Sequence, residues 1–426
     1  MKDSNKVLVI GGGGREHAII HKLKESDKVS KIYCAPGNGG IARDAECVPI
    51  GVMEFDKLVD FAKSNEIDMV MVAPDDPLAA GAVDAFENAG IRAFGPNKRA
   101  AIIEGSKAFS KDLMKKYNIP TAKYEVFSNS IEAIDYIKEQ DTYPIVVKAD
   151  GLALGKGVII AETFEDAEKA VHEIMDDKVF GSAGGKVVIE EFLTGPEISV
   201  LAFTDGKTIK PMVSAQDHKR AFDNDKGPNT GGMGTFSPSR IYTDELADEC
   251  MKNIFIPTMN AMNSENRTFK GVLYFGLMKT PDGVKVIEYN CRFGDPETQV
   301  VLPRLESDLF EIFDAVIDER LNEIDIKWND GAAVCVVLAS GGYPRKYQTG
   351  YPIEGLCRAE SAGALIFHAG TKADGDNILT SGGRVLGVTA VASNLDDAIK
   401  TAYGYVDLIS FKDMHYRKDI GIKKYN

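Results

Sequence analysis

Short apolar runs alternate with polar or glycine-rich segments along the first hundred residues. Residues 7–10, 32–34, 69–72 and 91–94 are almost wholly apolar, which is typical of strands buried on both faces of a parallel sheet. The stretch 78–88, which ends before a glycine, is suited to a helix. This alternation predicts an α/β domain over residues 1–103 that is built on a doubly wound open sheet.

Three loops follow these runs, at residues 11–14, 36–38 and 74–77. The carboxyl ends of parallel strands share one edge of the sheet, so the loops should converge there. A glycine-rich turn before a helix presents backbone N–H groups to an anion, which favours a small molecule that carries phosphate. A nicotinamide dinucleotide is disfavoured, because Glu16 or His17 occupies the third glycine position of Gly-x-Gly-x-x-Gly.

The pattern changes after residue 104. It predicts a helix from Lys107 to Tyr117 and an amphipathic helix over 163–175, which Thr163 caps. Further strands are predicted at residues 144–149, 157–161 and 186–190, with hairpins at residues 205–206 and 281–283. A composition break at 328–331 precedes another buried strand, so we predict a central domain over 104–328 and a small C-terminal α+β domain over 329–426.

Composition and charge limit the kinds of partner. The chain has 426 residues, of which 44% are hydrophobic and 27% charged, and a net charge of -14. This acidity argues against general binding to nucleic acid or to an anionic membrane. The six cysteines are widely spaced, and no apolar run reaches the roughly 20 residues that a membrane helix needs. The N-terminus does not resemble a signal peptide, so we expect a cytoplasmic protein without zinc or disulfides.

A polar pair on a predicted strand, Glu288 and Asn290, indicates a metal site. If residues 284–290 form a regular strand, the two residues share a face with Val284 and Val286. A carboxylate and an amide oxygen suit magnesium, and Arg292 beside them would suit a phosphoryl group in transfer. In the alternative interpretation, Glu288 and Asn290 face water and Arg292 forms a structural salt bridge with Asp295 or Glu297.

Three lysines surround a glycine-rich loop at residues 150–157. Lys148 ends an apolar strand, Lys156 lies in the loop, and Lys107 begins a helix whose backbone N–H could also meet an anion. The loop does not match a Walker A motif, because three residues separate its glycines and Gly157 follows the lysine. Each lysine alone could be solvated, but together with the metal pair they indicate a polyphosphate clamp. The later crossover at residues 190–197 could pair with an adenine edge and a ribose.

The order of these features resembles the ATP-grasp superfamily, and longer motifs resemble the phosphoribosylamine–glycine ligase family within it. The similarity extends over the whole chain. The motifs that carry it are Gly-Gly-Arg-Glu-His17, Pro36-Gly-Asn38, Glu104-Gly-Ser-Lys107, Lys148-Ala-Asp-Gly-Leu-Ala153, Gln216-Asp-His-Lys-Arg220, Gly227-Pro-Asn-Thr-Gly-Gly-Met-Gly234, Asn290-Cys-Arg-Phe-Gly-Asp-Pro-Glu-Thr-Gln299, His368-Ala-Gly-Thr-Lys372 and Arg417-Lys-Asp-Ile-Gly421.

This resemblance implies a central ATP-grasp fold with a mobile nucleotide-binding subdomain over residues 121–193. It implies an enzyme of de novo purine biosynthesis that joins glycine to 5-phosphoribosylamine, using ATP and Mg²⁺ or Mn²⁺. Glycinamide ribonucleotide, ADP and phosphate would form through a glycyl phosphate intermediate. The partners would be small molecules, and we expect a monomer.

The resemblance also assigns residues by position. Those expected to bind ATP are Lys107, Lys148, Glu190, Leu193 and Glu197, with Glu190 and Leu193 offering backbone groups to adenine and Glu197 contacting the ribose. Those expected to act in catalysis are Arg292, Asp295 and Lys156, and the metal ligands are Glu288 and Asn290. Candidates for the phosphoribosylamine or glycine pocket are Gly13, Gly14, Arg15, Glu16, Gly37, Asn38, Asp217 and Lys219.

Two positions depart from the family pattern. The strand at residues 272–277 carries no acidic residue, so metal binding would depend on two protein ligands, phosphates and water. Asp75 stands where the family usually has Glu, which leaves its contact with the sugar open.

The competing interpretations are another ATP-grasp enzyme, such as a carboxylase, and a nucleotide-binding regulator without catalysis. Residues 216–220 argue against the first, and the presence of Lys148 and Arg292 argues against the second.

Overall fold

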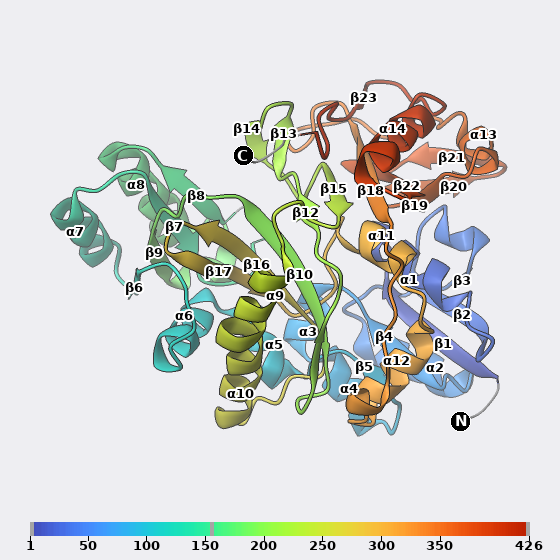
Figure 1. Cartoon of the computed structure of the whole chain (residues 1–426), viewed down its shortest axis with the longest axis horizontal. Coiled ribbons are helices and arrows are strands. Elements are labelled where there is room, and N and C mark those ends of the chain that lie inside the picture. Colours follow the sequence, from blue (N-terminus) through green and yellow to red (C-terminus); the bar gives the residue numbers. More distant parts are fainter. Residues whose placement is uncertain (1–3, 154–156, 423–426) are drawn as a thin grey trace.

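The N-terminal region forms a five-stranded parallel sheet in the order β3-β2-β1-β4-β5 (Figure 1). The protein is described here from a computed structural model that covers residues 4–153 and 157–422. The strands are β1 (Asn5–Gly11), β2 (Val29–Pro36), β3 (Glu46–Cys47), β4 (Met69–Val72) and β5 (Ala93–Phe94), and the helices are α1 (Gly14–Leu23), α2 (Phe55–Ser64), α3 (Asp75–Ala80) and α4 (Ala82–Asn88).

Both faces of this sheet are buried, as the apolar runs predicted. Leu8 and Ile10 pack in one hydrophobic cluster with residues of α2 and α4, whereas Val7 and Val9 pack in a second cluster with residues of α1. The doubly wound sheet is therefore confirmed. The single helix expected over residues 78–88 is wrong, because Gly81 takes a φ of +101° and divides the segment into α3 and α4.

Two antiparallel sheets follow in the central region. The first has the order β6-β9-β7-β8 and lies at one end of the molecule with α7 and α8 (Figure 1). Its elements are β6 (Tyr124–Phe127), α7 (Ser130–Gln140), β7 (Ile145–Ala149), β8 (Val158–Ala161), α8 (Phe164–Val171) and β9 (Val187–Glu191). The Thr163 hydroxyl accepts a hydrogen bond from the Asp166 N–H, which confirms the predicted cap of α8.

The second central sheet has the order β11-β10-β16-β17. Both predicted hairpins occur in it, at the β10–β11 and β16–β17 turns. Its strands are β10 (Glu197–Thr204), β11 (Ile209–Pro211), β16 (Gly271–Thr280) and β17 (Gly283–Asn290), and the neighbouring helices are α5 (Lys98–Gly105), α6 (Lys107–Lys116), α9 (Asp244–Cys250) and α10 (Ile256–Ser264).

A register shift in β17 alters which residues share a face. Val286 pairs with Leu277 but Glu288 pairs with the adjacent Gly276, so one extra residue of β17 is accommodated between them. Val284 and Val286 consequently point into the hydrophobic cluster with Tyr289, whereas Glu288 and Asn290 point to the other face. Glu288 and Asn290 do share a face, but the prediction that the valines share it is wrong.

The C-terminal region contributes most of a third, antiparallel sheet. Its strands are β12 (Gln216–Asp217), β15 (Gly234–Ser237), β18 (Ala332–Ser340), β22 (Arg384–Ala392) and β19 (Leu365–His368), with β23 (Met414–His415) paired to β18. Strands β12 and β15 come from the middle of the chain. The other elements are α11 (Thr298–Val301), α12 (Leu309–Ile317), α13 (Leu356–Ser361), α14 (Leu395–Val406) and the hairpins β13 (Arg220–Phe222) with β14 (Lys226–Asn229) and β20 (Thr371–Asp374) with β21 (Asn377–Thr380).

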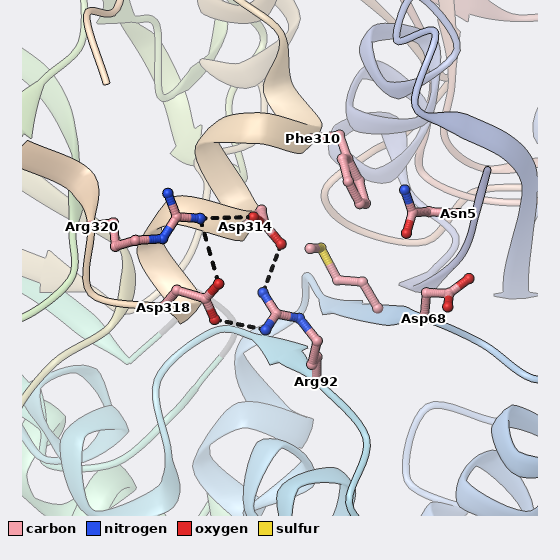
Figure 2. Close-up of a pocket in the computed structure, with 8 residues that line it drawn as sticks. Asn5, Asp68, Arg92, Phe310, Asp314, Asp318 and Arg320 are labelled. Atoms are coloured by element: carbon pink, nitrogen blue, oxygen red, sulfur yellow. Dashed lines mark hydrogen bonds and ion pairs between the residues drawn. The ribbon is translucent and has the colours of Figure 1, made fainter. Parts of the chain in front are cut away.

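A network of charged residues connects the N-terminal sheet to α12 (Figure 2). Arg92 contacts Asp314 at 2.7 Å and Asp318 at 2.6 Å, and Arg320 contacts Asp314 at 3.0 Å. These residues line a pocket of about 530 Å³ with Asn5, which begins β1. The pocket therefore lies at the amino ends of the strands, at the opposite edge from the glycine loops.

In the part of the chain that the structure describes, no helix is both long and apolar enough to span a bilayer.

Candidate active site

Strand β17 carries Glu288 and Asn290 on the face opposite to Val286, and Glu288 lies near lysines of the predicted site. The Glu288 carboxylate lies 3.4 Å from the Lys219 ammonium, which also lies 3.1 Å from Glu197. The positive charge of Lys219 is the main cause that lowers the pKa of Glu288 to about 2, and Lys148 and Lys107 act in the same direction. Glu288 is therefore ionised at neutral pH, as a metal ligand must be.

A divalent cation fits this pair by the chemistry of its donors, a carboxylate and an amide oxygen. Among the residues that the structure describes, no group of three or more His, Cys, Asp or Glu side chains could hold a metal ion. Two protein oxygens leave the remaining positions to phosphate oxygens and water, which suits Mg²⁺ or Mn²⁺.

Arg292 lies next to this pair and is held by Glu104, a residue of a quoted motif to which the sequence analysis gave no role. Its Nη2 lies 3.3 Å from Glu104 Oε1 and donates a hydrogen bond of 3.2 Å to Asn290 Oδ1. Burial by itself would lower the pKa of the Arg292 guanidinium, but the negative charges of Glu104 and Asp75 raise this pKa above its usual value. The alternative salt bridge to Asp295 or Glu297 does not form, because Arg292 pairs with Glu104.

A buried carboxylate joins two lysines beneath the nucleotide region. Glu190 lies 2.9 Å from both Lys148 and Lys111, and the three side chains are 4%, 6% and 2% exposed. Burial lowers the pKa of Lys111 to about 8, although Glu190 opposes this. Lys111 was missed by sequence reasoning, yet its spacing of four residues from Lys107 on α6 placed both on one helix face.

Lys107 begins α6 beside the glycine-rich loop. Its ammonium donates to the Gly151 carbonyl at 2.9 Å, and burial lowers its pKa. The expectation that its backbone N–H meets an anion is wrong, because this N–H donates to the Asp150 carbonyl at 2.9 Å. The carboxylate of Asp150 also accepts from Ala108 N–H at 2.7 Å, so Asp150 occupies the start of the helix.

The remaining candidates for nucleotide binding lie outside this cluster of Glu190 and the lysines. Leu193 is half-buried in the connection between β9 and β10, and Glu197 begins β10 with its carboxylate paired to Lys219. Lys156 lies outside the described residues. The roles of Glu190 and Leu193 toward adenine stay predictions.

Two of the loops at the carboxyl edge of the N-terminal sheet meet, as predicted. Gly37 N–H donates to the Gly11 carbonyl at 3.1 Å, and Asn38 Nδ2 donates to the Gly12 carbonyl at 2.9 Å. Gly37 itself has no room for a side chain, because a Cβ there would lie 2.3 Å from the Cys47 sulfur. The third loop, which carries Asp75, lies near enough for Arg292 and Arg15 to lower the pKa of its carboxyl, although burial opposes them.

One amide of the glycine turn is occupied from within the protein. The Glu16 carboxylate accepts from Gly13 N–H at 2.6 Å and from Arg15 Nε at 2.8 Å. Arg15 Nη1 reaches the Phe293 carbonyl at 3.1 Å, while Gly14 packs against Gln299, whose Nε2 would lie 2.6 Å from a Cβ at Gly14. The glycine turn is thus fixed against the segment that follows Asn290.

Asp295 and Asp217 lie beside this contact. Asp295 Oδ2 is 3.6 Å from the position of a Cβ at Gly13, and the carboxylate pairs with Arg384 at 3.1 Å. Burial is the main cause that raises the pKa of Asp217 well above its usual value. Sequence reasoning missed Arg384, which lies 89 positions beyond Asp295 and within none of the motifs used.

The two central sheets, with Lys148 on one and the Glu288–Asn290 pair on the other, define the class of protein as an ATP-grasp enzyme. A family model described as the phosphoribosylglycinamide synthetase ATP-grasp (A) domain matches residues 105–298. The N and C domains of the same family match residues 5–104 and 333–423. The chain belongs to the phosphoribosylglycinamide synthetase family.

Two relatives that match over almost the full length are named phosphoribosylamine–glycine ligase. The relative from Halalkalibacterium halodurans is 51% identical and covers 98% of this chain and 96% of its own. The relative from Escherichia coli (strain K12) is 48% identical and covers 98% of each. A crystal structure of phosphoribosylamine–glycine ligase from Thermotoga maritima aligns with a TM-score of 0.84 at 32% identity, over 98% of this chain and 100% of that one.

Proposed function

We propose that the protein joins glycine to 5-phosphoribosylamine, with hydrolysis of ATP to ADP and phosphate, to form glycinamide ribonucleotide. The observation that carries this proposal is the contact between the glycine turn and the segment after Asn290. Arg15 donates to the Phe293 carbonyl at 3.1 Å, and Asp295 lies 3.6 Å from the Cβ position of Gly13. A phosphate-bearing amine at the glycine turn would thereby meet a phosphoryl group held near Arg292.

The first step is activation of the glycine carboxylate, whose oxygen attacks the γ-phosphorus of ATP and releases ADP. Lys148 and Lys107 supply positive charge for the phosphates, and Glu190 holds Lys148 in place from its buried side. Glu288 and Asn290 would hold Mg²⁺ or Mn²⁺, which supplies charge neutralisation at the phosphate oxygens. Phosphorylation converts a poor leaving group into a good one.

In the second step, the amine of phosphoribosylamine attacks the carbonyl carbon of glycyl phosphate. The C–N bond forms, the C–O bond to phosphate breaks, and the nitrogen loses a proton. Arg292 is suited to the acyl phosphate, because Glu104 fixes its guanidinium beside Asn290. The residues of the protein act mainly by orientation and by neutralising charge.

The N-terminal candidates divide into two roles. Asn38 donates to the carbonyls of Gly12 and His368 and accepts from the N–H groups of Gly40 and Ile41. Its side chain, like that of Glu16, therefore shapes the loops. Arg15 and the backbone N–H of Gly14 are the groups that would face the phosphoribosylamine itself, because the N–H of Gly13 is already bonded to Glu16.

The experiment is a phosphate-release assay in which phosphoribosylamine is generated in place, because this substrate is labile. Release should require ATP, glycine and phosphoribosylamine together, and chelation of the divalent metal should stop it until Mg²⁺ or Mn²⁺ is restored. Equal rates with alanine in place of glycine would contradict the substrate assignment.

We further expect the protein to be a monomer, which light scattering would measure, and to reside in the cytoplasm.

A further inference from the structure

Arg384, the first residue of β22, reaches from the C-terminal region to two segments of the candidate site. Its Nη2 lies 3.1 Å from Asp295 Oδ2, and its Nη1 donates to the Asp295 carbonyl at 2.9 Å. The same Nη1 donates to the Gly231 carbonyl at 2.5 Å and lies 3.4 Å from the Gly232 carbonyl. One guanidinium therefore serves a carboxylate and three carbonyl groups.

The two segments that Arg384 joins are in close contact. Gly232 has a φ of +112°, and a Cβ there would lie 2.4 Å from Pro296 and 2.8 Å from Asp217 Oδ1. A Cβ at Gly231 would lie 3.0 Å from the guanidinium carbon itself. A side chain at Gly232 would collide with Pro296, and Gly231 lies against the guanidinium, so the turn at residues 230–232 is in direct contact with Arg384 and Pro296.

Arg384 also determines how the Asp295 carboxylate is aimed. Oδ1 accepts from Gln299 Nε2 at 2.8 Å, and Oδ2, which faces Arg384, is the oxygen that lies 3.6 Å from the Cβ position of Gly13. Burial opposes ionisation, but Arg384 and then Arg15 lower the pKa of Asp295. The result is an ionised acceptor that points at the glycine turn, where a sugar hydroxyl or an amine could donate to it.

We propose that Arg384 is a positioning residue for phosphoribosylamine, which acts by holding Asp295 and the turn at residues 230–232 against the glycine turn of the N-terminal domain. The proposal rests on the proposed function, since it assigns the phosphoribosylamine side of that site. The C-terminal domain would thus help to determine which amine is accepted. A salt bridge that only connects the domains is the competing outcome.

The kinetic test compares Arg384→Gln and Arg384→Lys with Arg240→Gln. Arg240 is a matched control, because its contacts lie outside the site. It pairs with Asp396 at 2.8 Å and donates to the Gly421 carbonyl at 3.5 Å. Arg384→Gln should raise the KM for phosphoribosylamine about 10- to 100-fold, the range for loss of hydrogen bonds to charged groups, and leave the KM for ATP unchanged. Arg384→Lys should recover part of the loss, because it restores the charge without the planar fork.

A double-mutant cycle with Asp295→Asn tests whether Arg384 acts through Asp295. The loss of kcat/KM for phosphoribosylamine in the double variant, expressed as free energy, should be smaller than the sum of the two single losses, because Asp295→Asn has already removed the shared interaction and only the contacts of Arg384 with the turn remain. Fully additive losses, or equal changes in the KM of all three substrates, would overturn the positioning role.

Hydrogen exchange separates this proposal from the proposed function. In Arg384→Lys, which keeps the charge, and in Arg384→Gln, amides of residues 230–235 and 294–299 should exchange faster, while those of β1 and β16 stay unchanged. If these amides exchange faster in the variants but the wild type has no ligase activity, the proposed function is contradicted and the positioning role of Arg384 is not. Unchanged exchange in those segments would overturn the role of Arg384 whatever the activity.

Discussion

The Glu104 carboxylate lies 3.3 Å from the Arg292 guanidinium and also accepts a 2.7 Å hydrogen bond from the backbone N–H of Cys291. Glu104 lies in the last turn of α5, shortly before Lys107, and Arg292 follows the metal pair with only Cys291 between them. One buried carboxylate therefore fixes both the side chain of Arg292 and the backbone that carries it. The nucleotide half and the acyl half of the site share this contact.

Glu104→Gln should reduce kcat about 10- to 100-fold with little change in the KM for ATP, because the neutral amide no longer holds the charge of Arg292 in place. Steady-state kinetics at saturating glycine measures the effect. Glu311→Gln, which removes an ion pair with Lys28 on the surface, serves as the control. An unchanged kcat in Glu104→Gln would contradict the role given to this pair.

Lys111→Met should raise the Kd for ATP about 5- to 10-fold, because Glu190 would then draw Lys148 away from the phosphates. Equilibrium binding of ATP measures this directly. Lys115→Met on the same helix is the matched control, since its ammonium lies over the Tyr124 ring at 5.5 Å and outside the Glu190 contact. Equal affinity in the two variants would show that Lys111 is only a packing residue.

His218 should make the protein less stable in mild acid. Its Nδ1 donates to the Gly234 carbonyl at 3.2 Å, its Nε2 accepts from Gly421 N–H at 3.3 Å, and burial lowers its pKa to about 4. Between that pH and its ordinary value of about 6.5, the unfolded chain binds a proton that the folded protein does not. Stability is therefore fully present above pH 6.5 and falls as the pH drops toward 4.

Urea unfolding of wild type and His218→Gln across this pH range measures the difference, which should reach roughly 2–3 kcal/mol. A wild type as stable at pH 4.5 as at pH 7, relative to His218→Gln, would contradict the burial of a neutral imidazole.

The charged network of Figure 2 should affect stability but not catalysis. Arg92→Ala removes contacts to Asp314 and Asp318, and we expect a loss of about 1 kcal/mol because Arg92 is 40% exposed. Thermal unfolding measures the loss, and all three KM values should stay within error of the wild type. A raised KM in Arg92→Ala would mean that the pocket at the amino edge communicates with the site.

Sequence patterns predicted the parts of the fold that depend on local periodicity. The buried strands of the N-terminal sheet, the cap at Thr163 and the shared face of Glu288 and Asn290 are all confirmed. The face of Val286 was predicted wrongly, because a register shift depends on the partner strand β16 and not on the sequence of β17 alone. Regular alternation cannot reveal one inserted residue.

The contacts that complete the site could not be predicted for a related reason. Arg384 meets Asp295 across 89 positions, and Glu104, in the last turn of α5, meets Arg292, which follows β17 much later in the chain. Neither pair follows from spacing, because only the tertiary packing of segments that are distant in the sequence brings the partners together. Lys111 is different, since its position on the helix face of Lys107 was visible in the sequence.

Transfer of the oxygen of glycine to phosphate tests the central claim most directly. Glycine labelled with ¹⁸O at both carboxylate oxygens is incubated with the enzyme, ATP, Mg²⁺ and phosphoribosylamine generated in place, and the products are analysed by mass spectrometry. If the carboxylate attacks ATP and the amine then displaces phosphate, the released phosphate carries one ¹⁸O and the amide of the product keeps the other. Unlabelled phosphate in the presence of labelled product would contradict activation of glycine as an acyl phosphate.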